Sequence, residues 1–156
     1  KFHVREKYTK AEKSENNQMV FEDSCVEFFV SPSNDGIYYN FEFNPIGATL
    51  LGCGTERCNN TTVDSRHIDL IQRFASMGKK PFPEIKGDNE WTLTVVIPFG
   101  VFFKHKIENI KGKSFRANFY KCGDKLCVPH YMTWNPVKTE QPDYHCPEYF
   151  GLLKFI

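Results

Sequence analysis

FRANFYKCGDKLCVPHYMTW, residues 115–134, contains the alternation that decides the fold. Successive side chains of a β-strand point to opposite faces, so spacing alone assigns the first eight residues to two faces. One face is apolar and the other carries a guanidinium, an amide and a phenol: Phe115, Ala117 and Phe119 against Arg116, Asn118 and Tyr120. After a Gly-Asp turn, residues 129–136 are dense in aromatic and polar rings. The stretch therefore predicts a strand and a loop that together can hold a small polar ligand with an apolar face.

Two further segments repeat this division into an apolar and a polar face. Residues 21–30 place Glu27 on the polar face, and residues 38–44 place Glu42 there. If the three strands lie side by side, these groups share one surface: Glu27, Glu42, Arg116, Asn118 and Tyr120. Lysine is scarce on that surface, which favours a semi-enclosed polar floor over a solvated face with scattered ion pairs.

The rest of the chain predicts more strands than helices. Strands are expected at 1–8, 91–98 and 149–156, a hairpin turn at 31–36, loops at 10–18 and 47–62, and a connector at 81–89. Residues 65–77 fit either a short helix or a strand. Many short strands with regular turns indicate an all-β protein, an antiparallel β-sandwich, and the length suits one domain over residues 1–156.

Composition narrows the function classes. The net charge is +1, so the chain lacks the broad positive footprint of a nucleic-acid-binding protein. No apolar run is long enough to span a membrane. Aromatic residues make up 15% of the chain, which favours strands and stacking surfaces.

Six cysteines, an even number, favour an oxidising compartment. Two pairs share a spacing of four intervening residues: Cys53 with Cys58 and Cys122 with Cys127. This spacing is compatible with local disulfides, with free thiols and with a zinc site. Cys25 and Cys122 fall on the polar strand face. We therefore expect any disulfide to involve the loop cysteines: Cys53, Cys58, Cys127 or Cys146.

Six segments, in order, resemble the family 9 carbohydrate-binding modules, and more closely the bacterial family 9-like domains of the DOMON superfamily. They are FEDSCVEFFVSP (21–32), YYNFEFNPIG (38–47), WTLTVVIPF (91–99), RANFYKCGD (116–124), PHYMTWNP (129–136) and PDYHCPEYFGLLKF (142–155). The resemblance implies a jelly-roll-like antiparallel sandwich that binds an oligosaccharide or polysaccharide between two aromatic rings without cleaving it. It also implies structural calcium, a secreted, periplasmic or cell-surface location, and a place in a larger polysaccharide-processing protein. Family domains have a strand before the position of Lys1, so the resemblance implies a fragment or a shortened relative.

The resemblance also assigns candidate ligand-binding residues. Trp134 matches the Trp of the second aromatic motif, and Phe21 stands where relatives usually have Trp, which makes the aromatic clamp smaller here. Glu27 matches a carboxylate that accepts sugar hydroxyls. With neighbouring polar positions, the implied set is Phe21, Glu27, Arg116, Asn118, Tyr120, His130 and Trp134. A core role for Trp134, a structural role for His130 and simple packing for Tyr120 are the alternatives.

Three other functions remain open. Glu27 and Glu42 can form a carboxylate pair of the glycoside hydrolase kind. A haem-binding redox domain of the DOMON type is the second, because the chain has three Met (Met19, Met77 and Met132) and five His. An accessory domain with a lost site is the third. We assign no catalytic residue, and no cofactor apart from the calcium that the resemblance implies.

Overall fold

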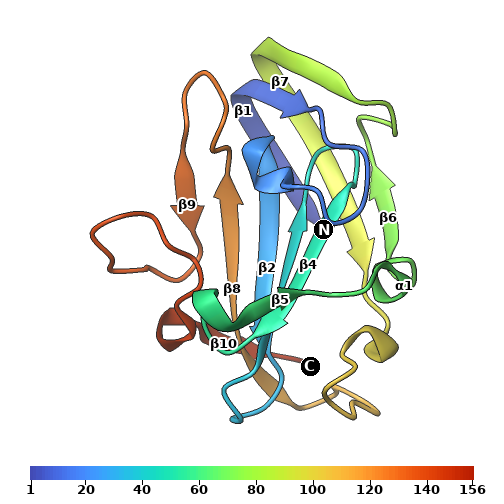
Figure 1. Ribbon diagram of the computed structural model, residues 1–156, viewed down its shortest axis with the longest axis vertical. Helices are drawn as coiled ribbons and strands as arrows, with labels where there is room; N and C mark the ends of the chain where they lie inside the picture. The colour runs from blue at the N-terminus through green and yellow to red at the C-terminus, as the bar shows by residue number, and fades with distance from the viewer.

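The computed structural model describes residues 1–156, and the fold is a sandwich of two antiparallel sheets (Figure 1). The smaller sheet has the strand order β1-β7-β6: Phe2–Ala11, Phe82–Val96 and Gln72–Ala75. The larger sheet has the order β10-β8-β2-β3-β4-β5: Gly151–Lys154, Ser114–Cys122, Cys25–Ser31, Tyr38–Phe43, Thr49–Gly54 and Asn60–Thr62. A short strand, β9 (Tyr131–Thr133), also pairs with β8. The expected antiparallel sandwich is confirmed.

Helical structure is limited to single turns. The one α-helix, α1 (Ser65–Ile68), lies beside β6 (Figure 1). Four 3-10 turns occupy Val20–Glu22, Arg57–Asn59, Phe99–Val101 and Pro147–Tyr149. None of these helices has the length and apolar character needed to cross a membrane.

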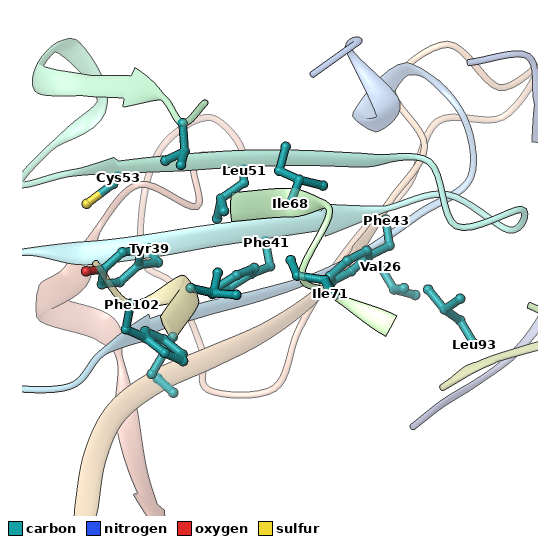
Figure 2. Close-up of a cluster of buried hydrophobic side chains, with 14 of the residues drawn as sticks. Val26, Tyr39, Phe41, Phe43, Leu51, Cys53, Ile68, Ile71, Leu93 and Phe102 are labelled. Carbon is teal, nitrogen blue, oxygen red and sulfur yellow. The ribbon is translucent and has the colours of Figure 1, made fainter. Parts of the chain in front are cut away.

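The main core fills the space between the two sheets. Figure 2 shows side chains of β2, β3 and β4 converging with those of the 68–71 segment and Leu93 of β7. Val26, Phe41 and Leu51 come from three neighbouring strands, and each is at most 2% exposed. These are the apolar faces of the alternating patterns, so the alternation in the sequence reports the core correctly.

Three segments differ from the expectation. Residues 47–62 were expected as a loop but contain β4 and β5, because Gly52 and Gly54 make room for neighbouring side chains and backbone rather than forming a turn. A β-carbon on Gly54 would overlap the backbone of residues 59 and 60. Residues 81–89 begin β7 instead of forming a connector, and their pairing with β1 includes register shifts. Residues 65–77 contain both α1 and β6, so each alternative was half correct.

The cysteines also depart from the expectation in one respect. All six are free thiols in the structure. Cys53 is not a loop residue, because it lies within β4 and is 4% exposed in the core. Cys25 and Cys122 are directly opposite one another on β2 and β8.

Candidate functional site

The polar groups of the three central strands lie on one face of the larger sheet, as the alternation predicts. Glu27 is directly opposite Glu42 on β3 and Tyr120 on β8, and Ser31 is opposite Arg116. Directly opposed residues of antiparallel strands point to the same side. We call this side the outer face, because the main core lies on the other side.

The outer face is covered by residues 141–145, which lie between β9 and β10 in the chain. Tyr144 stacks on Tyr120 with ring centroids 4.0 Å apart and planes 9° apart. The Tyr120 hydroxyl donates to the Tyr144 carbonyl at 3.2 Å, and the Tyr144 hydroxyl donates to the Lys121 carbonyl at 3.2 Å. Tyr120 is therefore a support beneath the cover and is 3% exposed.

Two further contacts hold this cover. Arg57 Nη2 lies 2.7 Å from Asp143 Oδ1, and the Tyr38 hydroxyl shares a hydrogen bond of 2.7 Å with His145 Nδ1. Burial, followed by the charge of Arg57, lowers the pKa of His145 to about 4. The ring is therefore neutral at neutral pH.

Glu27 and Glu42 are buried carboxyl groups under this cover, 3% and 5% exposed. Burial raises the pKa of Glu27 well above its ordinary value, and the adjacent Cys122 and Glu42 raise it further. Burial raises the pKa of Glu42 to about 7. Removing a carboxylate from water disfavours its charged form, so both groups gain from any donor that a ligand supplies.

Glu42 is oriented by a short chain of side-chain hydrogen bonds. Asn60 Nδ2 donates to Asn40 Oδ1 at 2.9 Å, and Asn40 Nδ2 donates to Glu42 Oε1 at 3.0 Å. Gly52 makes room for this chain, because a β-carbon there would overlap both amides. The second oxygen, Glu42 Oε2, is buried and has no hydrogen-bond partner. Buried polar atoms are normally paired, so this acceptor is one that a ligand can satisfy.

These carboxyl groups lie in a cavity of about 100 Å³, which we call the outer pocket. Its aromatic lining includes Phe21, Tyr131 and Tyr144, and its polar lining includes Glu27, Glu42, Arg57, Asp124 and His145. Phe21 belongs to the 3-10 turn Val20–Glu22 and not to a strand as expected, because β2 begins only at Cys25. The outer pocket thus combines ring faces with hydrogen-bond acceptors, which is what a sugar ring with axial C–H groups and equatorial hydroxyls requires.

A second and larger cavity of about 540 Å³ lies at the edge of the sandwich between β1 and β8, and we call it the edge cleft. Its buried charged groups, Lys121 and Glu6, form an ion pair, although Glu6 Oε2 has no aligned hydrogen-bond donor. Lys121 Nζ lies 2.8 Å from Glu6 Oε2, although not in hydrogen-bond alignment, and 2.8 Å from His130 Nε2. Trp91 Nε1 donates to Glu6 Oε1 at 2.7 Å. Burial, followed by the charge of Lys121, lowers the pKa of His130.

Trp134 lines the edge cleft and not the outer pocket. Its backbone N–H donates to the Phe119 carbonyl at 2.9 Å, and its ring meets the Phe119 ring edge-on with centroids 5.8 Å apart. Phe119 belongs to the apolar face of β8, so the Trp134 ring is drawn away from Glu27. The ring remains 53% exposed.

Asn118 and Arg116 do not line the outer pocket either. Asn118 is fully buried and clamps Asn135: its Nδ2 donates to the Asn135 carbonyl at 2.9 Å, and its Oδ1 accepts from the Asn135 N–H at 2.8 Å. Arg116 is exposed and donates to the Glu148 carbonyl at 3.2 Å. Both side chains therefore position the segment between β9 and β10.

The candidate residues are thus distributed over three places. Phe21 and Glu27 line the outer pocket. Tyr120, His130 and Trp134 line the edge cleft, and Arg116 and Asn118 contact the segment between β9 and β10. Nine outer-pocket residues are absent from the expected set: Phe29, Glu42, Arg57, Cys122, Asp124, Tyr131, Pro142, Tyr144 and His145. The alternation of residues 38–44 places Glu42 on the polar face. No local sequence pattern predicts that residues 141–145, which are distant in sequence, cover this face.

The structural calcium that the resemblance implies needs a cluster of oxygen ligands. Calcium prefers six to eight oxygen ligands. The one group of three His, Cys, Asp or Glu side chains whose ligand atoms converge is Cys25, Glu27 and Cys122, of which two are sulfur ligands. This group does not fit calcium.

Comparison with known proteins identifies relatives of the whole chain. The model of carbohydrate-binding family 9 matches residues 1–155. A crystal structure of a proposed carbohydrate-binding protein from Bacteroides uniformis ATCC 8492 is 42% identical and has a TM-score of 0.95. That similarity covers 99% of this chain and 71% of the other. No protein of curated function matches the sequence.

Proposed function

The chain belongs to carbohydrate-binding family 9, and on that premise we propose that the outer pocket binds the terminal unit of an oligosaccharide or polysaccharide without cleaving it. The observation that carries this proposal is the buried, unpartnered Glu42 Oε2 beside Glu27. A sugar hydroxyl is a donor that can satisfy this acceptor, and a buried polar group left without a partner costs about 1–3 kcal/mol.

The size of the outer pocket supports a chain end. Pockets that enclose a whole small molecule have about 300–1,000 Å³, whereas this one has about 100 Å³. One hydroxyl-bearing edge of a terminal ring can enter, while the ring face rests on the aromatic side chains at the mouth. Phe21 and the half-exposed Tyr131 are the candidates for that contact.

The edge cleft is the less favourable site. It is larger and more apolar, and its buried charges are paired with one another, so a sugar would have to compete with existing contacts. Trp134 is the only candidate platform there that the sequence resemblance assigns. The two sites can be separated by experiment because Tyr131 and Trp134 are close in sequence and line different cavities.

The test begins with a calorimetric screen of the purified domain against oligosaccharides with free and blocked chain ends. Tyr131→Ala should weaken the best ligand by about thirtyfold, the usual cost of about 2 kcal/mol for a central aromatic anchor. Trp134→Ala, the matched control, should stay within about twofold. The reverse result would show that the sugar binds in the edge cleft instead. Absence of binding to every glycan would contradict the proposed function, and release of shorter products would contradict binding without cleavage.

We further propose that the chain acts outside the cytoplasm, next to catalytic domains that cleave its polysaccharide. Family membership supports this setting, since a non-catalytic binding domain is useful where an insoluble or dilute substrate must be kept near an enzyme. Cell fractionation with an antibody against the domain tests the location.

A further inference from the structure

Two thiols and a carboxyl group converge at the floor of the outer pocket. Cys25 and Cys122 are directly opposed on β2 and β8, and Glu27 lies two residues after Cys25 on the same face. The two sulfur atoms and a carboxylate oxygen all lie within 4.8 Å of one another, and Cys122 Sγ is 3.0 Å from Glu27 Oε1. All three side chains are at most 3% exposed.

This triangle has nearly the dimensions of a tetrahedral zinc site. Zn–S bonds of about 2.3 Å and Zn–O bonds of about 2.0–2.2 Å put neighbouring ligand atoms roughly 3.4–3.8 Å apart. The Cys122 Sγ–Glu27 Oε1 distance of 3.0 Å is slightly below that range and no separation exceeds 4.8 Å, so binding an ion requires only adjustment of these side chains. Because the three ligands lie on two paired strands at the centre of the sheet, the backbone already fixes their positions.

No cationic side chain forms an ion pair with the buried Glu27, whose Oε1 contacts the Cys122 thiol. The nearest lysine in sequence, Lys121, points to the edge cleft and pairs with Glu6. A dication bound here would supply a positive charge next to the Glu27 carboxyl group. The unpartnered Glu42 Oε2, on the strand next to Glu27, is an independent sign that the floor accepts a further group.

We propose that Cys25, Glu27 and Cys122 bind one borderline-soft divalent cation of the Zn²⁺ type, with the fourth coordination position open to the outer pocket. Glu27 and Cys122 line that pocket, so a water molecule can occupy the open position. On binding, two S–H bonds break, two metal–sulfur bonds form, and at least two protons pass to the solvent. Thiolate ligands select such ions over calcium and magnesium.

The test uses the reduced, metal-free domain and Co²⁺ as a spectroscopic probe, with Zn²⁺ as competitor. One Co²⁺ should bind per chain with a thiolate-to-metal charge-transfer band and the d–d bands of tetrahedral cobalt, and Zn²⁺ should abolish both. Cys25→Ala and Cys122→Ala should weaken Co²⁺ binding by more than about a hundredfold, since even changes outside the ligand set cost about 10–100-fold. Cys58→Ala and Cys127→Ala, at exposed thiols, are the matched controls and should change nothing.

Three results would overturn the proposal. One is the absence of the charge-transfer band in the wild-type domain, a readout that needs no variant to fold. Another is unchanged Co²⁺ affinity in folded Cys25→Ala or Cys122→Ala. The third is a Cys25–Cys122 disulfide in the protein as purified, found by peptide mapping after thiol blocking. The proposal does not rest on the sugar site: metal titration needs no glycan, and glycan titration of the metal-free domain tests the proposed function separately.

Discussion

Glu27 and Glu42 are directly opposed on neighbouring strands, and both are at least 95% buried. Two buried carboxylates on adjacent strands destabilise the fold unless protons or hydrogen-bond donors from a ligand compensate their charge. Glu42→Gln keeps the shape and the acceptor for Asn40 but replaces the unpartnered oxygen by an amide. We expect glycan affinity to fall about 5–150-fold, the equivalent of the roughly 1–3 kcal/mol that an unsatisfied buried polar group costs, while thermal stability stays equal or rises.

Calorimetry and a thermal melt on the same preparation measure both effects. Glu108→Gln, at an exposed position away from the outer pocket, is the control. A large loss of stability in Glu42→Gln, with affinity unchanged among the folded molecules, would show that Glu42 serves the fold and not the ligand.

Gly52→Ala tests the orientation of Glu42 from a distance. The added methyl group must displace the Asn40 and Asn60 side chains, so the hydrogen bond to Glu42 is lost along with the packing. Overpacking of this kind costs about 1–3 kcal/mol. Urea unfolding should show that cost, and glycan binding should weaken as well. Gly87→Ala, where the nearest atom would be 3.5 Å away, is the matched control and should be tolerated.

The lowered pKa of His145 predicts that stability depends on pH. Its pKa is about 4 in the folded protein against about 6.5 for an ordinary histidine, so the unfolded chain takes up a proton first as the pH falls. Stability is therefore lost between pH 6.5 and 4, and His145 accounts for about 2–3 kcal/mol of that loss.

His145→Gln removes this titration. Urea unfolding at pH 7 and pH 4.5 should show a smaller loss in the variant than in the wild type, by about 2 kcal/mol. His3→Gln, at an exposed position, controls for the removal of an imidazole. Equal losses in His145→Gln and the wild type would contradict burial of a neutral ring.

Lys121 and Glu6 form a buried ion pair, with side chains 11% and 6% exposed. Removing one partner leaves a buried charge unpaired and typically costs about 3–5 kcal/mol of stability, whereas removing both can be nearly neutral. Lys121→Met and Glu6→Gln should each destabilise the domain strongly, and the double variant should recover most of the loss. The exposed pair Arg5–Glu90 is the comparison, because Arg5→Met should stay within about 1 kcal/mol. Additive losses at Lys121 and Glu6 would refute the coupling.

The alternation of apolar and polar residues predicts most of the strands. It predicts fewer of the residues that line the outer pocket. Glu27 and Glu42 follow from alternation, because a sheet face is a local property of each strand. Trp134 does not, since its direction is set after β9 ends, by a backbone hydrogen bond to Phe119. Tyr144 and His145 reach the outer face through a long irregular segment, and no periodicity encodes where such a segment lies. β4 was missed because Gly52 and Gly54 resemble turn residues while serving side-chain and backbone packing.

Both ends of the segment between β9 and β10 are tied to one strand, because β9 pairs with β8 at residues 120–122 and β10 pairs with it at residues 114–117. The segment is therefore a loop that begins and ends at the same strand, β8. Lengthening such a loop costs little free energy, because loop-closure entropy grows only slowly with length. Changes in it reshape the cover over Glu27 and Glu42 and leave the central strands paired. A longer or shorter segment would therefore change the shape of the outer pocket at its mouth, while the carboxyl groups beneath it and the sheet that carries them keep their positions.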